Sequence, residues 1–89
     1  MRAVITVIGK DMVGILAGVS NICVEYKVNI IEVTQSIMQD MFAMIMMVDI
    51  SGASAPFADI STSLKQFGRE NALSVHIMHE DIFNSMHRI

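Results

Sequence analysis

The sequence predicts an α+β fold in which a four-stranded antiparallel sheet carries two helices on one face. Two observations support this fold class. Apolar, β-branched runs of strand length alternate with longer segments whose apolar residues recur at helical spacing. In addition, 89 residues with 53% hydrophobic and 17% charged residues suit one globular domain, 1–89.

The first half of the chain predicts a strand, a helix and a hairpin. Residues 2–9 are a β-branched run typical of a buried strand, and residues 13–27 carry a helical stripe of apolar residues. That stripe consists of Ile15, Val19, Ile22, Cys23 and Tyr26. Strands are expected over residues 28–39 and 42–50, with a tight turn at Gln39-Asp40-Met41 between them.

The second helix is predicted over residues 56–70, after a turn-rich stretch. Pro56 is expected at the first helical position, where its missing N–H is not needed, with Ser54 or Ala55 as the N-cap. A single core-facing stripe is formed by Phe57, Ile60, Leu64 and Phe67.

The remaining residues complete the order of elements. Residues 73–79 predict a fourth strand, and residues 81–88 predict a short C-terminal helical extension, whose start is favoured by Glu80 and Asp81. The resulting order βαββαβ is typical of the ferredoxin-like sandwich.

The predicted third strand has no polar side chain on either face from Phe42 to Val48. A sheet covered by helices on one side should instead alternate apolar and polar residues, and an apolar patch of this size is rarely left in water. The C-terminal stripe of Ile82, Phe83, Met86 and Ile89 is too small to cover the whole second face. We therefore expect a homodimer or a higher homo-oligomer.

Composition excludes several classes of partner. A net charge of −3 with six basic residues provides no electrostatic footprint for nucleic acid or for an anionic membrane surface. The longest apolar run, Met41 to Val48, is too short to span a bilayer, and no secretory signal is evident. A single cysteine suits a reducing compartment, so we expect a cytoplasmic protein.

Neither the methionines nor the histidines indicate a metal or a cofactor. His76 and His79 lie three residues apart on a strand and therefore point to opposite faces, and Cys23 belongs to the core stripe of its helix. The methionines are interpreted as adaptable filler of a buried sheet or an interface. These are mainly Met38, Met41, Met44, Met46, Met47 and Met78.

The strongest indication of a binding site is the turn from the first strand into the first helix. Its sequence, Gly9-Lys10-Asp11-Met12-Val13-Gly14-Ile15-Leu16, leads directly into the helical pattern. Free N–H groups and the helix dipole make such a helix start a cradle for a carboxylate or a phosphate. Asn29 opens the next strand, and together these features predict a small-molecule site.

Residues Asp11-Met12-Val13-Gly14-Ile15-Leu16, the helix after them and Val28-Asn29-Ile30 resemble the ACT domain. This family consists of regulatory modules that bind amino acids at subunit interfaces. The resemblance extends from Met1 to about His79, and Gly9-Lys10-Asp11 before Gly14 is most similar to small stand-alone ACT proteins of bacteria and archaea. Similar units occur in the glycine-cleavage repressor and in formyltetrahydrofolate deformylase.

The resemblance implies a ligand held by the first loop and by the start of strand two, often from different subunits. The positions that it implies are Asp11, Gly14 and Asn29. The neighbouring residues and the strand face of Asn29 add further candidate ligand-binding residues, which are Met12, Val13, Ile15, Ile30 and Gln35. The family commonly has Pro where this chain has Val13, and often Asn where it has Asp11. An ionised Asp11 accepts but does not donate hydrogen bonds, which favours a ligand ammonium over a carboxylate at that side chain.

Each of these candidates also has a structural explanation. Asp11 is a suitable N-cap, and Asn29 can hydrogen-bond its own backbone at the end of a turn. Gly9 is expected to be a turn residue with positive φ, whereas Gly14 would allow a helix and a strand to approach closely. Gln35 is expected to share a strand face with Asn29, opposite Glu32.

Three classes of function compete on this fold. An acylphosphatase-like enzyme needs an Arg in the first loop, where Lys10 is the only cation, and an RNA-binding domain needs exposed aromatics on a basic sheet. A ligand-free protein-interaction module is the remaining alternative. We expect a non-enzymatic amino-acid sensor without cofactors, acting on a client enzyme or regulator.

Overall fold

A computed structural model describes residues 1–10 and 14–86 of the chain, without the side chain of Met38. The order of elements agrees with the predicted βαββαβ pattern followed by a short helix. The elements are β1 (Arg2–Gly9), α1 (Ile15–Glu25), β2 (Asn29–Met38), β3 (Met41–Asp49), α2 (Phe57–Glu70), β4 (Ser74–His79) and α3 (Glu80–Met86).

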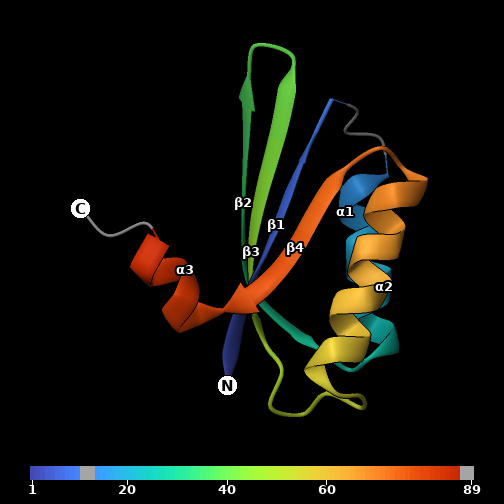
Figure 1. The fold of residues 1–89 in the computed structure, drawn as a ribbon, viewed down its shortest axis with the longest axis vertical. Helices are drawn as coiled ribbons and strands as arrows, with labels where there is room; N and C mark the ends of the chain where they lie inside the picture. The colour runs from blue at the N-terminus through green and yellow to red at the C-terminus, as the bar shows by residue number, and fades with distance from the viewer. Residues whose placement is uncertain (11–13, 87–89) are drawn as a thin grey trace.

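The four strands form one antiparallel sheet in the order β2-β3-β1-β4, so β2 and β4 are its edges. Helices α1 and α2 cover one face, and α3 lies on the other side of the sheet (Figure 1). We call these the helix face and the outer face. The predicted α+β, ferredoxin-like sandwich is confirmed, including the C-terminal helix.

The core lies between the helix face and the two long helices. Alternate residues of β1 and β3 point into it, and Ile60 and Leu64 of α2 meet them, as the predicted stripe requires. Phe57 and Phe67, the other members of that stripe, are partly buried against the same core. The strand residues buried on this face are Ala3, Ile5, Val7, Phe42, Met44, Met46, Val48, Val75 and Ile77.

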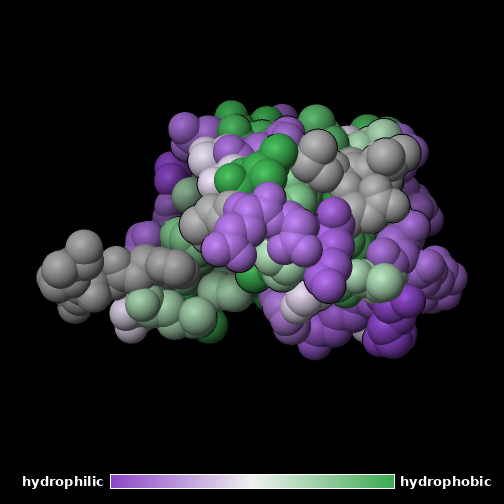
Figure 2. Space-filling model, turned by 90° about the horizontal axis from the view of Figure 1, so that it is seen from above, coloured by the Kyte–Doolittle hydropathy of each residue, from purple (hydrophilic) through white to green (hydrophobic). Residues whose placement is uncertain are grey.

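The outer face is apolar but only partly covered. By register, Val4 lies on this face beside Met47 and Met78, and it is fully buried because α3 packs against β1 and β4 there. Further along the same face, Ile8 and Ile45 remain 47% and 39% exposed. Viewed from the hairpin end of the sheet, hydrophobic residues reach the surface among hydrophilic ones (Figure 2).

Two chain reversals use non-glycine residues with positive φ. Helix α1 ends at Glu25, two residues earlier than predicted, because Lys27 adopts φ 56° and cannot continue a right-handed helix. The hairpin turn is where it was predicted, between Met38 and Met41, and Gln39 takes the left-handed conformation there with φ 58°.

The predicted start of the second helix is wrong by one residue. Pro56 is the N-cap of α2 and not its first helical residue, since its ψ of 155° is extended. Its carbonyl already accepts hydrogen bonds from the N–H groups of Asp59 and Ile60. Proline fixes φ but not ψ, so the residue also fits this extended position before the helix.

Candidate functional site

Gly14 stands at the start of α1 in a conformation that glycine favours. As the N-cap it has φ 74° and ψ 1°, in the left-handed region. A Cβ added there would meet no atom within 4 Å, so close packing does not explain this glycine. The expectation that Gly14 lets a helix approach a strand is therefore wrong, and the space beside its Cα is open.

The first turn of α1 has backbone donors at that open position. The carbonyl of Gly14 accepts a hydrogen bond from the N–H of Gly18 at 2.9 Å. The N–H groups between these two residues belong to the first turn, where N–H groups have no partner within the helix. Within the described residues no side chain caps this helix. The side chain of Ile15 is buried in the core, so this residue offers only its backbone to a ligand.

Three predicted site residues, Asp11, Met12 and Val13, lie outside the described residues. The ligand role of all three therefore remains a prediction, whereas the N-cap of α1 is Gly14 and not Asp11. The described part of this loop supplies Lys10, which is exposed, and Gly14.

Gly9 has a different role from the one predicted. Its φ is not positive, and a Cβ at this position would lie 2.2 Å from Cδ2 of Leu73. Gly9 is therefore required by the close approach of Leu73 to the end of β1. The two glycines of the first loop thus exchange their expected roles.

A β-bulge separates Asn29 from Gln35. Asn29 pairs with Asp49 on the outer face, whereas Gln35 pairs with Met44, which is buried on the helix face. Ile31 is the extra residue between the two registers. Because one inserted residue reverses the alternation, the prediction that Asn29 and Gln35 share a face is wrong.

The same register brings Gln35 to the first-loop end of the sheet. Gln35 pairs with Met44, which pairs with Val7 near the end of β1. Gln35 is exposed and lies on the face that α1 covers. Ile30, by contrast, pairs with Val48 and is partly buried against the core at the other end of β2.

Within one chain, Gly14 and Asn29 are not brought together. Helix α1 begins at the hairpin end of the molecule and returns to the opposite end, where β2 starts (Figure 1). Its 11 residues correspond to a separation of about 16 Å. The candidate site therefore divides into two parts at opposite ends of the molecule.

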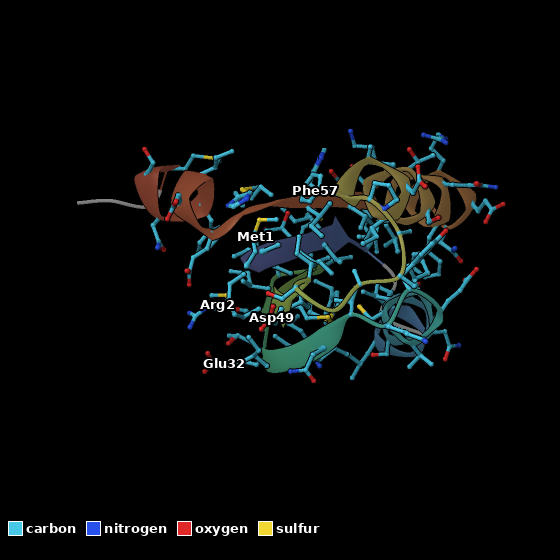
Figure 3. All side chains as sticks on the ribbon, turned by 90° about the horizontal axis from the view of Figure 1, so that it is seen from below. Met1, Arg2, Glu32, Asp49 and Phe57 are labelled. Atoms are coloured by element: carbon cyan, nitrogen blue, oxygen red, sulfur yellow. The ribbon has the colours of Figure 1, made fainter. Side chains whose placement is uncertain are left out.

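The ion pairs among the described residues lie away from the first loop. Arg2 pairs with Glu80 at 2.5 Å, which ties α3 to β1, and the N-terminal amine contacts Asp49 and Ser51 (Figure 3). A hydrogen bond of 2.9 Å from the Ser51 N–H lowers the pKa of Asp49. These contacts hold the N-terminus and α3 at the end of the sheet where β1 begins. They do not form a reactive centre.

The described residues provide little for catalysis or metal binding. Burial raises the pKa of the Cys23 thiol to about 11, so this side chain is an inert core residue, as predicted. His76 and His79 face opposite sides of the sheet, as expected. Within residues 1–10 and 14–86 no three His, Cys, Asp or Glu side chains could share a metal ion. None of the described helices is long and apolar enough to be a membrane span.

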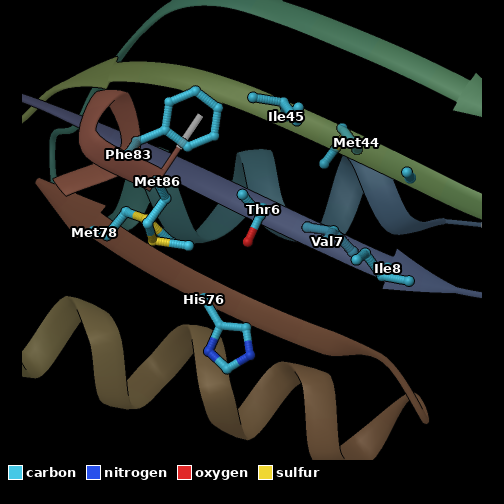
Figure 4. Close-up of a pocket in the computed structure, with 10 residues that line it drawn as sticks. Thr6, Val7, Ile8, Met44, Ile45, His76, Met78, Phe83 and Met86 are labelled. Atoms are coloured by element: carbon cyan, nitrogen blue, oxygen red, sulfur yellow. The ribbon is translucent and has the colours of Figure 1, made fainter. Parts of the chain in front are cut away.

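One hollow of the surface was missed by sequence reasoning. It has a volume of about 300 Å³ and lies on the outer face, between α3 and the open part of the sheet (Figure 4). Its lining includes Thr6, Ile8, Ile45, His76, Phe83 and Met86. The apolar outer-face residues of the third strand were the signal that could have located it.

Comparison with known proteins agrees with this architecture. Residues 2–78 match the model of the ACT domain family. A UPF0237 protein of Clostridium perfringens is 51% identical over 89 residues, covering 100% of both chains. A UPF0237 protein of Methanocaldococcus jannaschii is 48% identical and covers 99% of this chain and 98% of its own length.

A solved structure supports the fold directly. The ACT domain protein from Streptococcus pneumoniae superimposes with a TM-score of 0.81 at 34% identity, and 93% of each chain is covered. ACT domains are typically regulatory domains that bind small ligands. The bacterial and archaeal relatives are proteins of nearly the same length as this chain. The chain therefore belongs to the ACT domain family.

Proposed function

We propose that this protein is a regulatory module that binds an amino acid, or a similar small molecule, between two copies of the chain. The observation that carries the proposal is the start of α1. Gly14 is left-handed and open on its side-chain side, and the helix start has no side-chain cap among the described residues. Backbone N–H groups at a helix start are suited to a ligand carboxylate.

A second copy supplies the other half of the site in this proposal. Strand β2 is an edge of the sheet, so its outward N–H and C=O groups are free to pair with another chain. Antiparallel pairing of two β2 strands would place the start of one beside the end of the other. The start of β2 in one copy, at Asn29, would then lie beside the hairpin end of its partner, where the first loop and Gln35 are.

Ligand binding at such an interface would couple the two copies. A ligand that binds only the assembled state stabilises it by mass action, and a change in subunit orientation reports its presence. In this proposal the signal passes to a client enzyme or regulator in the cytoplasm, and the protein itself catalyses no reaction.

A thermal-shift screen of the pure protein against the common amino acids tests the proposal. We expect one amino acid, or a small related group, to raise the melting temperature, because a ligand at 100 times its Kd adds about 2.7 kcal/mol of stability. The matching amino alcohol, which lacks the carboxylate, is the control and should not stabilise. If no amino acid shifts the melting temperature even at millimolar concentration, the proposal fails.

A further inference from the structure

We propose that the outer face of the sheet is a second self-association surface, on which another copy of this chain docks. This surface is distinct from the β2 edge and from the first loop. It consists of the open part of the outer face and of the apolar side of α3. The inference does not depend on whether the protein binds an amino acid.

The open part of the outer face is apolar at its centre. Ile8 and Ile45 project from the two central strands and are 47% and 39% exposed, and Ala43 between them is half-buried. By register, the residues of this part of the face are Thr6, Ile8, Thr34, Ser36, Ala43, Ile45, Ser74 and His76. The polar members are small or lie on the edge strands, which is the arrangement of an apolar centre with a polar rim.

Helix α3 provides a matching ridge. Ile82 and Met86 are 54% and 65% exposed on this short helix, although both are apolar. Phe83 and Met86 form one wall of the hollow of about 300 Å³, and the open strands form its floor (Figure 4). Each chain thus carries an apolar ridge next to an apolar hollow.

A ridge beside a hollow is self-complementary under two-fold symmetry. If two outer faces meet, α3 of one copy lies against the part of the sheet that α3 of the other copy leaves open. An isologous contact of this kind uses the same residues twice and closes without forming a filament. A second copy therefore accounts for both the exposed ridge and the incompletely covered sheet.

The charges on this face also permit a second copy. A chain with a net charge of −3 repels its own kind, so self-association is favoured where the contacting strands carry no carboxylate, although α3 itself begins with Glu80 and Asp81. The outer-face residues from Thr6 to Ile8 and their described neighbours include no carboxylate and no Lys or Arg. Arg2, Glu32 and Asp49 lie at the other end of this face, where they would form a rim (Figure 3).

The whole outer face is about as large as one side of a standard interface. The strands run along the 36 Å axis of the molecule, and the width of the sheet follows its 19 Å axis (Figures 1 and 3). A face of these dimensions measures about 700 Å² in all, and α3 covers its Val4 end, so the exposed side of α3 would supply part of the ~800 Å² per partner of a standard interface.

Light scattering of the variant Ile45→Arg tests the proposal. The side chain lies at the centre of the open part of the face, so an arginine there would be buried under the apolar side of the partner's α3. We expect the mass of the variant to be half that of the parent at the same micromolar concentration. Val24→Arg, at a position 74% exposed on α1, is the matched control and should keep the parental mass. Ile8→Arg provides a second variant if Ile45→Arg fails to fold.

A second measurement reports on the surface itself. With methyl-labelled methionines, a soluble nitroxide should broaden Met86 weakly in the parent and strongly in Ile45→Arg, while the buried Met46 stays unaffected in both. A monomeric parent, or an unchanged mass in folded Ile45→Arg and Ile8→Arg, overturns the proposal and leaves the face to an apolar ligand or another protein. Because neither readout requires an amino acid, failure here is distinguishable from failure of the proposed ligand site.

Discussion

At the scale of single residues, Gly9 and Gly14 show how two glycines of one loop are required for different reasons. A Cβ at Gly14 would have room, but the residue has φ 74°, which favours glycine. Gly9 has an ordinary φ, but Leu73 leaves no room for a Cβ there. The sequence indicates that both positions are special. It does not indicate which one is limited by backbone conformation, because this depends on the direction in which α1 leaves the sheet.

The conformation of Gly14 leads to a prediction about stability. Gly14→Val should lower the free energy of unfolding by about 1–3 kcal/mol, because a β-branched residue is strained at positive φ. Gly14→Asn should lose less, since asparagine enters the left-handed region more readily. Urea unfolding at one fixed protein concentration measures both. Equal stability of the valine and asparagine variants would contradict the described conformation.

At the scale of elements, the helices and strands were predicted to within about two residues, but the faces of β2 were not. The alternation of β-branched residues and the helical stripes depend on local sequence, so they are visible before folding. The bulge at Ile31 depends on how β2 pairs with β3, and no glycine marks it. It therefore reversed the expected relation of Asn29 to Gln35, although both lie in a correctly predicted strand.

The packing of α2 against β4 yields a second prediction, at Gly68. A Cβ there would lie 2.8 Å from the carbonyl oxygen of Leu73 and 3.0 Å from Cγ2 of Val75. The backbone oxygen cannot move aside easily, so Gly68→Ala should destabilise by about 1–3 kcal/mol, despite the higher helix propensity of alanine.

Gly52→Ala is the matched control for Gly68→Ala. A Cβ at Gly52 meets nothing within 4 Å, and this residue does not have positive φ. The control should stay within about 0.5 kcal/mol of the parent in urea unfolding. If Gly68→Ala is as stable as Gly52→Ala, α2 does not pack as tightly on β4 as described.

At the scale of the whole molecule, the chain leaves two surfaces incomplete. The β2 edge has free backbone groups, and the outer face has apolar side chains that α3 covers only in part. The sequence already indicated the second surface, since Phe42 to Val48 has no polar residue for solvent. It did not locate the hollow beside α3, because that depends on where a C-terminal helix of seven residues docks.

Because Gly14 and Asn29 lie far apart within one chain, a ligand site that uses both residues needs two copies. A site shared between copies requires the first loop of one chain and the β2 strand of another. Two defective variants, Gly14→Val and Asn29→Ala, should therefore complement each other in a mixed oligomer. The unchanged first loop of Asn29→Ala would meet the unchanged β2 strand of Gly14→Val, and one binding site would be restored.

The decisive measurement is calorimetric titration of the amino acid found in the screen into three samples: each variant alone, and the purified mixed oligomer. Neither variant alone should bind detectably. The mixed oligomer should bind with the parental affinity and about half the parental number of sites, since pairs that combine both defects stay inactive. A mixed oligomer that forms but binds no ligand would contradict a site built from two copies.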